Sequence, residues 1–508
     1  MSLSPVDVLV FAAFYGLVLV VSLVKSRGRK TSEDYFLGGR QLPWWLIGVS
    51  IVAANISTEQ FVGMAGQAAG DVGLAVSAWQ LTGAVGIVVV AFTFLPRFLR
   101  AGIYTMPEYL EYRYSPAART VMSVLTVVVY VTVTTTAVLY SGATALETIF
   151  GLSLPVALAV ICGIAIAYVL WGGLLAAVWA DLFQGSALLV GGLLTLGLGL
   201  AAVGGPSAFL RANADRLHMI LPRSHPELPW TVLVGGMWIP IFYYCGLNQF
   251  ITQRTLAART LSQGQAGIVL AAALWLLVPF GIVMPGTVAH QLYGSALERP
   301  DQAYPMLVRE LVPTGLRGFI LAALAGAVIS TLASVLNSAS TLFTMDLYRR
   351  FLRKAASQAE LVAIGRATTL LALVLAAVLA ASPFLKGGVF AFIQEFQGFV
   401  SPGIVAAFVF GFAVPKAPPL AGLAALVLSA PVYGLLAWTW PGVAYLHRML
   451  ATLAVLIAVM AAITAVRPLP APRALPVREG FDMRPSRPAL AGGLAVILAV
   501  LAFFRVFR

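Results

Sequence analysis

The chain has 508 residues, of which 60% are hydrophobic and only 10% are charged. Soluble globular domains carry about 25% charged residues, so this composition excludes a soluble protein. The apolar runs at 188–202 and 370–381 are continuous, whereas a membrane β-barrel alternates apolar and polar residues. The composition therefore predicts an all-α polytopic membrane protein, with roughly 20 residues in each spanning helix.

Apolar segments separated by charged or by Pro- and Gly-rich breaks predict about fourteen transmembrane helices. In chain order they are 5–24, 43–69, 73–96, 119–149, 153–171, 174–203, 229–250, 264–292, 316–344, 362–384, 387–413, 418–439, 446–466 and 488–506. Cys162 and Cys245 both lie in these segments, which favours buried free thiols over a disulfide.

The net charge of +13 reflects basic loops rather than a nucleic-acid surface. Most of the 32 Lys and Arg residues fall on one side of the membrane, in loops 25–42, 97–118, 251–263, 345–361 and 467–487. The positive-inside rule makes this side cytoplasmic, and an even number of spans places both termini outside. We expect a multi-pass protein of the cell (inner) membrane that contacts the lipid bilayer and has no nucleic-acid or obligate protein partner.

The second predicted span contains a run of polar residues between Ser50 and Gln60. Polar side chains are costly inside a bilayer and mark candidate functional sites. The run fits either hydrogen bonding between helices or a discontinuous helix whose free carbonyls face a cavity. We favour the discontinuous helix, because so many polar groups do not suit an uninterrupted helix that faces lipid.

The ninth span carries a stripe of small residues, in which Ala327, Ser330, Thr331 and Ser334 share one helix face. Such a stripe suits either tight helix packing or ion coordination, and the pattern alone does not decide between them. Hydroxyl and carbonyl oxygens are hard ligands. If the stripe binds an ion, Na⁺ fits better than Ca²⁺, because at most one Asp lies nearby.

Two further spans are interrupted by helix-breaking residues. The seventh has Gly and Pro between Gly235 and Gly246, and the eleventh has Gln394 and Glu395 before another Pro-Gly break. Interrupted helices in corresponding positions of two halves indicate a transporter site. The second and seventh spans lie five helices apart, as a five-plus-five inverted repeat requires.

Several stretches together resemble the solute:sodium symporter family, in its bacterial sodium/glucose (galactose) cotransporter branch. The matching stretches are Glu33 to Arg40, Ala53 to Phe61, Gly102 to Tyr109, Asn248 to Arg259, Leu332 to Ser338, Phe343 to Asp346 and Ile393 to Glu395. The resemblance implies a LeuT-like core with a first inverted repeat at 43–203 and a second at 229–413. Residues 1–42 would then be an extra helix with a cytoplasmic loop, and 418–508 would form peripheral helices.

The resemblance also implies a sodium site. Its ligands would be the backbone carbonyls of Ala53, Ile56 and Ala327 and the hydroxyls of Ser330 and Thr331. Some relatives hold a second sodium, for which Asp181 and Ser334 are the candidates. The alternative, which we favour, is an ion pair between Asp181 and Arg254.

The substrate site implied by the resemblance matches the family in part. The expected substrate-binding residues are Asn55, Gln60, Gln80, Tyr244, Trp275 and Gln394, and the expected gates are Met64, Trp79, Tyr244 and Phe390. Sugar-transporting relatives carry an acidic residue at Gln80, a hydroxyl at Gly83, an Asn at Ile241 and a Lys at Trp275. The loss of a carboxylate together with an ammonium group favours a neutral solute and disfavours an anion.

These features predict a sodium-coupled secondary active symporter that imports a small neutral solute, a sugar or polyol, by alternating access. The alternative is a proton-coupled or sodium-coupled carrier for a non-sugar solute. Glu59 and Glu395 could titrate in a proton-coupled carrier, although we expect core hydrogen bonds to hold both. Neither an HExxH motif, a P-loop nor a Ser/His set occurs in the sequence, so an enzyme is not expected.

Overall fold

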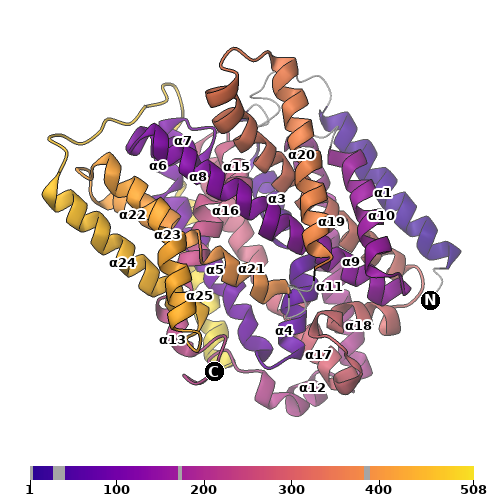
Figure 1. Ribbon diagram of the computed structural model, residues 1–508. Helices are drawn as coiled ribbons and strands as arrows, with labels where there is room; N and C mark the ends of the chain where they lie inside the picture. Colours follow the sequence, from indigo (N-terminus) through magenta and orange to yellow (C-terminus); the bar gives the residue numbers. More distant parts are fainter. Residues whose placement is uncertain (1–3, 27–39, 170–173, 383–388) are drawn as a thin grey trace.

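The computed structural model describes residues 4–26, 40–169, 174–382 and 389–508, and Figure 1 shows that this part of the chain is a bundle of helices. The family-like stretch at 33–39 and the turn near 172 lie outside the described residues. One isolated bridge joins Leu42 to Ala258, and the described residues form no sheet. The predicted all-α class is therefore confirmed.

Nine described helices, some built from several segments, are long and apolar enough to cross a membrane. They contain η3 and α5 (Gly73–Ser77, Ala78–Thr93), α8, η4 and α9 (Pro116–Val129, Tyr130–Thr135, Thr136–Phe150), α11 (Leu174–Ala202), α16, η7 and α17 (Leu261–Trp275, Pro279–Val283, Met284–Tyr293), α19 and η10 (Leu316–Thr341, Leu342–Leu352), α20 (Gln358–Ala380), α23 (Pro419–Thr439), α24 (Tyr445–Val466) and α25 (Arg487–Val506).

Two pairs of helices pass the same test together but are bent at a break. The first pair is α3 (Trp44–Asn55) with η2 and α4 (Gln60–Met64, Ala65–Ala69), bent by 57°. The second is α21 (Val389–Gln397) with α22 (Ser401–Ala413), bent by 47°. The predicted discontinuity of the second span is therefore present.

Three shorter apolar stretches complete the correspondence with the predicted spans. They are Pro5–Val18 of α1 (Pro5–Ser26), Leu154–Ile166 of α10 (Leu154–Val169) and Trp238–Leu247. The last belongs to the seventh predicted span, which is divided into α13 (Trp230–Val234), α14 (Trp238–Phe242) and η6 (Tyr243–Leu247). The helix α15 (Gln249–Leu256) begins at the end of that span and continues into the predicted loop 251–263. Each of the fourteen predicted ranges thus contains described helix.

Short helices lie beyond the ends of the long ones. Figure 1 shows α6 (Leu95–Ala101) and α7 (Met106–Arg113) at one end of the bundle, and α12 (Pro206–Ala212) and α18 (Ala303–Leu311) at the other. We expected only loops where α12 and α18 occur. Both form because an apolar side of each packs on the bundle, as the buried Phe209 and Leu307 do.

The first helix, α1, is fastened to the start of α19. The Asp7 carboxylate accepts hydrogen bonds from the backbone N–H groups of Gly315, at 2.7 Å, and Gly318, at 2.9 Å. It thereby satisfies free N–H groups at the start of a helix, where a negative charge is also favoured. At the other end of the span formed by α19 and η10, Asp346 of η10 pairs with Arg119 of α8 at 2.5 Å.

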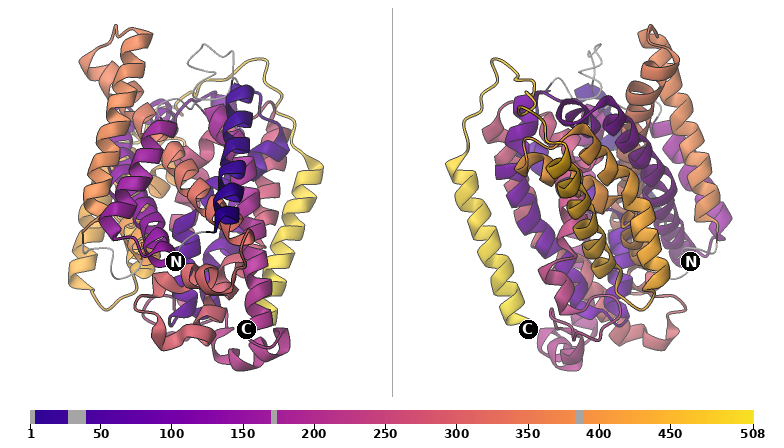
Figure 2. Two further views of the ribbon diagram at one scale, coloured as in Figure 1. Left: turned by 90° about the vertical axis from the view of Figure 1, so that its right-hand side faces the viewer. Right: turned by 60° about the vertical axis from the view of Figure 1, so that its left-hand side comes forward.

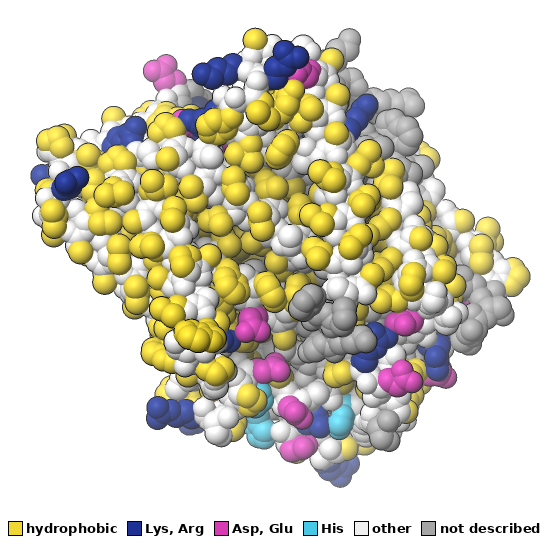
Figure 3. Space-filling model, in the orientation of Figure 1, with side chains coloured by type: hydrophobic (Ala, Val, Ile, Leu, Met, Phe, Trp, Pro, Cys, Tyr) yellow, Lys and Arg dark blue, Asp and Glu magenta, His cyan; other side chains and the backbone are white. Residues whose placement is uncertain are grey.

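The surface has the polarity expected of a membrane protein. In Figure 3, hydrophobic side chains cover the middle of the face, while Lys, Arg, Asp, Glu and His side chains gather towards its two ends. Figure 2 shows α25 at the edge of the bundle, and its C-terminal end points towards the lower half of the view, where the marked N-terminus also lies. Both marked termini lie towards the end that holds α12 and α18.

Candidate functional site

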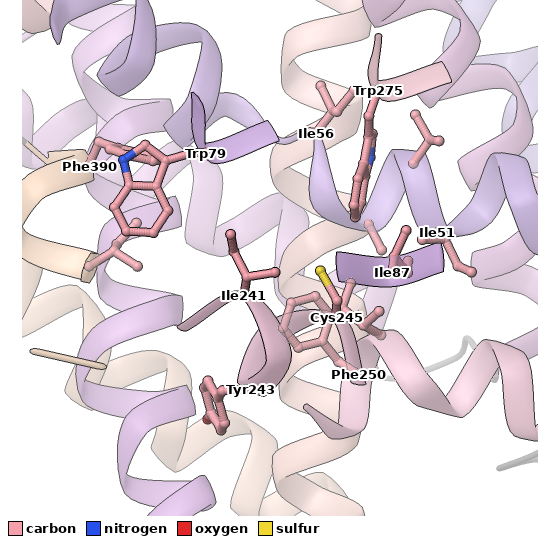
Figure 4. Packing of buried hydrophobic residues seen from close by; sticks show 14 of the residues in the cluster. Ile51, Ile56, Trp79, Ile87, Ile241, Tyr243, Cys245, Phe250, Trp275 and Phe390 are labelled. Carbon is pink, nitrogen blue, oxygen red and sulfur yellow. The ribbon is translucent and has the colours of Figure 1, made fainter. Parts of the chain in front are cut away.

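A central cavity lies among the interrupted helices. Its lining comes from α3, the break that follows it, η2, α5, α14, η6, α16 and α21. The lining residues are Asn55, Glu59, Gln60, Trp79, Gln80, Gly83, Pro240, Ile241, Tyr244, Cys245, Trp275, Phe390, Ile393, Gln394 and Gln397. Figure 4 shows Trp79 beside Phe390 on one side of this region and Trp275 on the other, with Ile241 and Cys245 between them. The break in α3 thus opens onto a cavity.

All six residues expected to bind substrate line this cavity, namely Asn55, Gln60, Gln80, Tyr244, Trp275 and Gln394. Gly83 and Ile241 line it as well. The four positions that depart from the sugar-site pattern therefore all face the same cavity as the positions that match it.

Three buried polar atoms in the lining have no hydrogen-bond partner. They are Oε2 of Glu59, Oε1 of Gln60 and Nε1 of Trp275. The other end of the Gln60 amide is fixed, because its Nε2 donates to the backbone carbonyl of Asn55 at 2.7 Å. Since buried polar groups are normally paired, the cavity offers a ligand two acceptors and one donor.

The two carboxylates singled out in the sequence are placed differently from expectation. Glu59 lines the cavity, and Glu395 is exposed and pairs with Arg448 at 2.9 Å. The expected core hydrogen bonds are therefore wrong for Glu395 and incomplete for Glu59. Glu59 lies between the end of α3 and the start of η2, and this break in the helix brings it to the cavity.

Aromatic side chains close the cavity. Trp79 and Phe390 meet edge to face, with ring centroids 5.7 Å apart. Tyr244 packs in the same manner on Phe250, also at 5.7 Å. Met64, the fourth expected gate residue, is fully buried in η2 but is not among the lining residues. This expectation came from the family resemblance and not from helical spacing.

The five residues expected to bind sodium come from two elements in contact, α3 with its following break and α19. All five are buried: Ala53, Ile56, Ala327, Ser330 and Thr331. Because α3 ends at Asn55, its last carbonyls lack the helical partners that a continuing helix would supply. Oγ1 of Thr331 has no hydrogen-bond partner, while Oγ of Ser330 donates to the Asp181 carboxylate.

The favoured ion pair between Asp181 and Arg254 is present. Nη2 of Arg254 donates to Oδ2 of Asp181 at 2.9 Å and to Oγ of Ser334 at 3.0 Å. Asp181 also accepts a hydrogen bond from Ser50 at 2.6 Å. The guanidinium group of Arg254 therefore contacts both Asp181 and Ser334, the two candidate ligands of a second sodium.

Comparison with known proteins agrees with this architecture. The family model described as "Sodium:solute symporter family" matches residues 35–427. The sodium/glucose cotransporter of Vibrio parahaemolyticus is 38% identical over 482 residues, covering 89% of this chain and 88% of that protein. The human sodium/myo-inositol cotransporter 2 is 34% identical over 80% of this chain and 66% of that protein.

A solved structure shares the fold. A Na⁺-coupled sialic acid symporter in a substrate-bound outward-open state superposes with a TM-score of 0.80. The alignment covers 93% of this chain and 99% of that one, at 21% sequence identity. The likeness concerns the fold, since the identity is low.

Proposed function

The chain belongs to the sodium:solute symporter family, and from this premise we propose that it imports a small neutral solute, a sugar or polyol, together with Na⁺. The observation that carries the proposal is the central cavity. Its lining combines free hydrogen-bonding groups with aromatic closure, and it adjoins a helix break next to a hydroxyl-bearing helix.

Sodium binds between the end of α3 and the middle of α19. The carbonyls of Ala53, Ile56 and Ala327 and the hydroxyls of Ser330 and Thr331 are its ligands. The free hydroxyl of Thr331 supports this assignment, because a buried unpaired polar atom is otherwise costly. The carbonyl end of α3 carries a partial negative charge that favours a cation.

The solute binds in the central cavity. Its hydroxyl groups donate to Glu59 and Gln60, and one of its oxygens accepts from the indole N–H of Trp275. A sugar or polyol supplies both kinds of group on adjacent carbons. The names of two relatives, which refer to glucose and myo-inositol, support this class of solute.

A second candidate is a neutral solute other than a sugar. Gln80, Gly83, Ile241 and Trp275 all line the cavity, so the departures from the sugar pattern affect direct contacts. Ile241 and Trp275 also make the lining more apolar than an Asn and a Lys would. This arrangement would suit a solute with fewer hydroxyls and a larger apolar face.

Alternating access couples the two fluxes. Sodium and solute bind from outside, Trp79 and Phe390 close over them, and Tyr244 then moves to release the solute inside. Coupling requires only that each ligand binds one conformation better than the other. One Na⁺ crossing 100 mV contributes about 2.3 kcal/mol, enough to concentrate a neutral solute roughly 50-fold.

The test is uptake of labelled glucose and myo-inositol into proteoliposomes. We expect accumulation with an inward Na⁺ gradient and none when choline replaces external Na⁺. Uptake that persists in choline and follows a proton gradient would overturn sodium coupling. If neither solute is carried, a thermal-shift screen of sugars, polyols and neutral amino acids in Na⁺ distinguishes the two candidate classes of solute.

The proposed orientation has both termini outside the cell (inner) membrane. It places the loops that hold α6 and α7 in the cytoplasm and α12 and α18 outside. Labelling of single cysteines introduced at Ala214 and Ala355, in a background that carries Cys162→Ala and Cys245→Ala, with a membrane-impermeant maleimide tests it. Only the cysteine at position 214 should react in intact cells, and the opposite result would reverse the orientation.

A further inference from the structure

Asp301 is a buried carboxylate in a segment outside the membrane-spanning helices. It belongs to the short turn η9 (Pro300–Gln302), just before α18, and only 4% of its surface is exposed. Carboxylates in such connecting segments normally lie in water. Asp301 does not line the central cavity, so the proposed binding of solute and sodium does not explain its burial.

The carboxylate is directed at the helix that carries an expected gate residue. Oδ2 of Asp301 accepts a hydrogen bond from the backbone N–H of Val389, at 3.2 Å. Val389 is the first residue of α21, and the next residue is Phe390, which closes the cavity against Trp79. The contact therefore holds the start of α21, as far as it is described, through a backbone N–H group.

The same turn also packs closely on the second half of the broken helix. A Cβ atom added at Gly66 of α4 would lie 2.9 Å from the carbonyl oxygen of Pro300 and 3.0 Å from Oδ1 of Asp301. One added at Gly63 would lie 2.8 Å from Cβ of Phe390. The turn η9, the η2–α4 segment and the start of α21 thus touch one another pairwise.

The turn is anchored separately to α9. Arg299 forms an ion pair with Glu147 and donates to the hydroxyl of Tyr140 at 3.3 Å. The elements packed on the turn are η2, α4, α9 and α18. Of these, η2 and α4 contain no titratable side chain, while α9 contributes Tyr140 and Glu147.

The remaining titratable groups near the turn are engaged elsewhere or lie farther along their helices. In α18, Tyr304 is hydrogen-bonded to Thr195, and Arg309 pairs with Glu310. In α21, Glu395 pairs with Arg448. Of the charged groups near the turn, Arg299 therefore acts most directly on Asp301.

We propose that Asp301 latches the outer gate: by accepting the Val389 N–H while packed on Gly66, it holds α21 and the η2–α4 segment together and so positions Phe390 over the loaded cavity. The inference rests on the proposed function, in which this side faces outwards and Phe390 is a gate. Asp301 is a positioning residue, since it touches neither the cavity nor the sodium ligands.

Protonation should strengthen the closed state. Burial raises the pKa of Asp301 to about 6 from its ordinary value of 3.8, although the Val389 N–H and Arg299 lower it in part. When the junction opens, water reaches the carboxyl group and its pKa falls towards the ordinary value. The closed state therefore binds the proton more tightly, and acidification from pH 7.5 to 5 favours closure by about tenfold.

Cys245 provides a native reporter, because it lines the cavity beneath the gate. In a Cys162→Ala background, the rate at which an impermeant methanethiosulfonate added outside modifies Cys245 measures opening of the gate. The rate is compared between variants at one pH, so that ionisation of the thiol cancels. Reconstituted uptake and thermal unfolding are measured on the same samples.

Asp301→Asn is the informative variant, since its amide oxygen can accept the Val389 N–H but does not titrate. We expect Cys245 to react more slowly than in the parent at both pH values, and the ratio of the two rates to be about tenfold larger at pH 7.5 than at pH 5. Asp301→Ala should react faster than Asp301→Asn at both pH values. Asp215→Asn, an exposed acid on the same side, should match the parent throughout.

Equal rates for Asp301→Asn and the parent at pH 7.5 would overturn the latch, as would a parent that never reacts from outside. If Asp301→Ala fails to fold, the Asn variant alone decides. Failure of the proposed function is distinguishable, because Na⁺ would then fail to drive uptake in the parent while the labelling comparison could still be made.

Discussion

Arg254 donates a hydrogen bond to Asp181 at 2.9 Å, and the two side chains are only 1% and 0% exposed. This pair joins α15, the helix that follows η6, to α11. Ser50 of α3 and Ser330 of α19 also donate to Asp181. One carboxylate thus connects four helices next to the proposed sodium ligands.

Replacing only one residue of this pair should destabilise the folded protein more than replacing both residues. Arg254→Met leaves a buried carboxylate without its counterion, which costs roughly 3–5 kcal/mol. Asp181→Asn combined with Arg254→Met should restore much of that loss. Thermal unfolding of the two single variants and the double variant in detergent gives the coupling, and additive losses would contradict it.

Thr331 should control affinity for sodium. Thr331→Ala removes one proposed ligand and should raise the Na⁺ concentration for half-maximal uptake about tenfold, whereas Thr331→Ser should restore it. The matched control is Thr341→Ala in the same helix, whose hydroxyl only donates to the carbonyl of Asn337. An unchanged sodium requirement in Thr331→Ala would remove this residue from the site.

Trp275 should contribute its indole N–H to the solute. Trp275→Phe keeps an aromatic ring but loses the donor, so we expect the solute KM to rise roughly two- to tenfold. Trp238→Phe is the control, because its N–H bonds to the carbonyl of Leu233 and it does not line the cavity. Equal effects of the two substitutions on KM would contradict the assignment.

Gly83 marks a place where a hydroxyl can be added. A Cβ at this position would lie 3.6 Å from the Trp275 ring, which is ordinary contact, so Gly83→Ser should fold normally. We expect it to lower the KM for a hexose. Gly86→Ser, one turn later, would collide with Ile241 and should lower the thermal unfolding temperature. A lower thermal unfolding temperature in Gly83→Ser would show that the cavity has no room for a side chain at this position.

Much of the fold followed from local sequence properties. Apolar runs and their interruptions by Pro, Gly and polar residues are properties of a single helix. The residue ranges of the spans and the break after Asn55 could therefore be predicted from the sequence. The lining of the cavity could be expected through family-like motifs. What could not be predicted depends on contacts between distant segments or on altered helical geometry.

Glu59 and Met64 illustrate that limit. Glu59 follows the break in α3 and Met64 ends the π-helical turn η2, so both lie where the helix departs from regular α-helical geometry. Glu395 was misjudged for another reason. Its partner, Arg448, comes from α24, 53 positions away in the chain, and no local pattern reveals that contact.

The capping of α19 by Asp7 bears on which part of the proposed sodium site would move. The start of this span is fastened to α1, and its far end is fastened to α8 through Arg119 and Asp346. A helix restrained at both ends serves as a fixed wall, so the hydroxyls of Ser330 and Thr331 should stay in place. Sodium would then be released when the carbonyl end of α3 withdraws from them. The helix α1, which lies outside both proposed repeats, would thus influence ion release without contacting the ion.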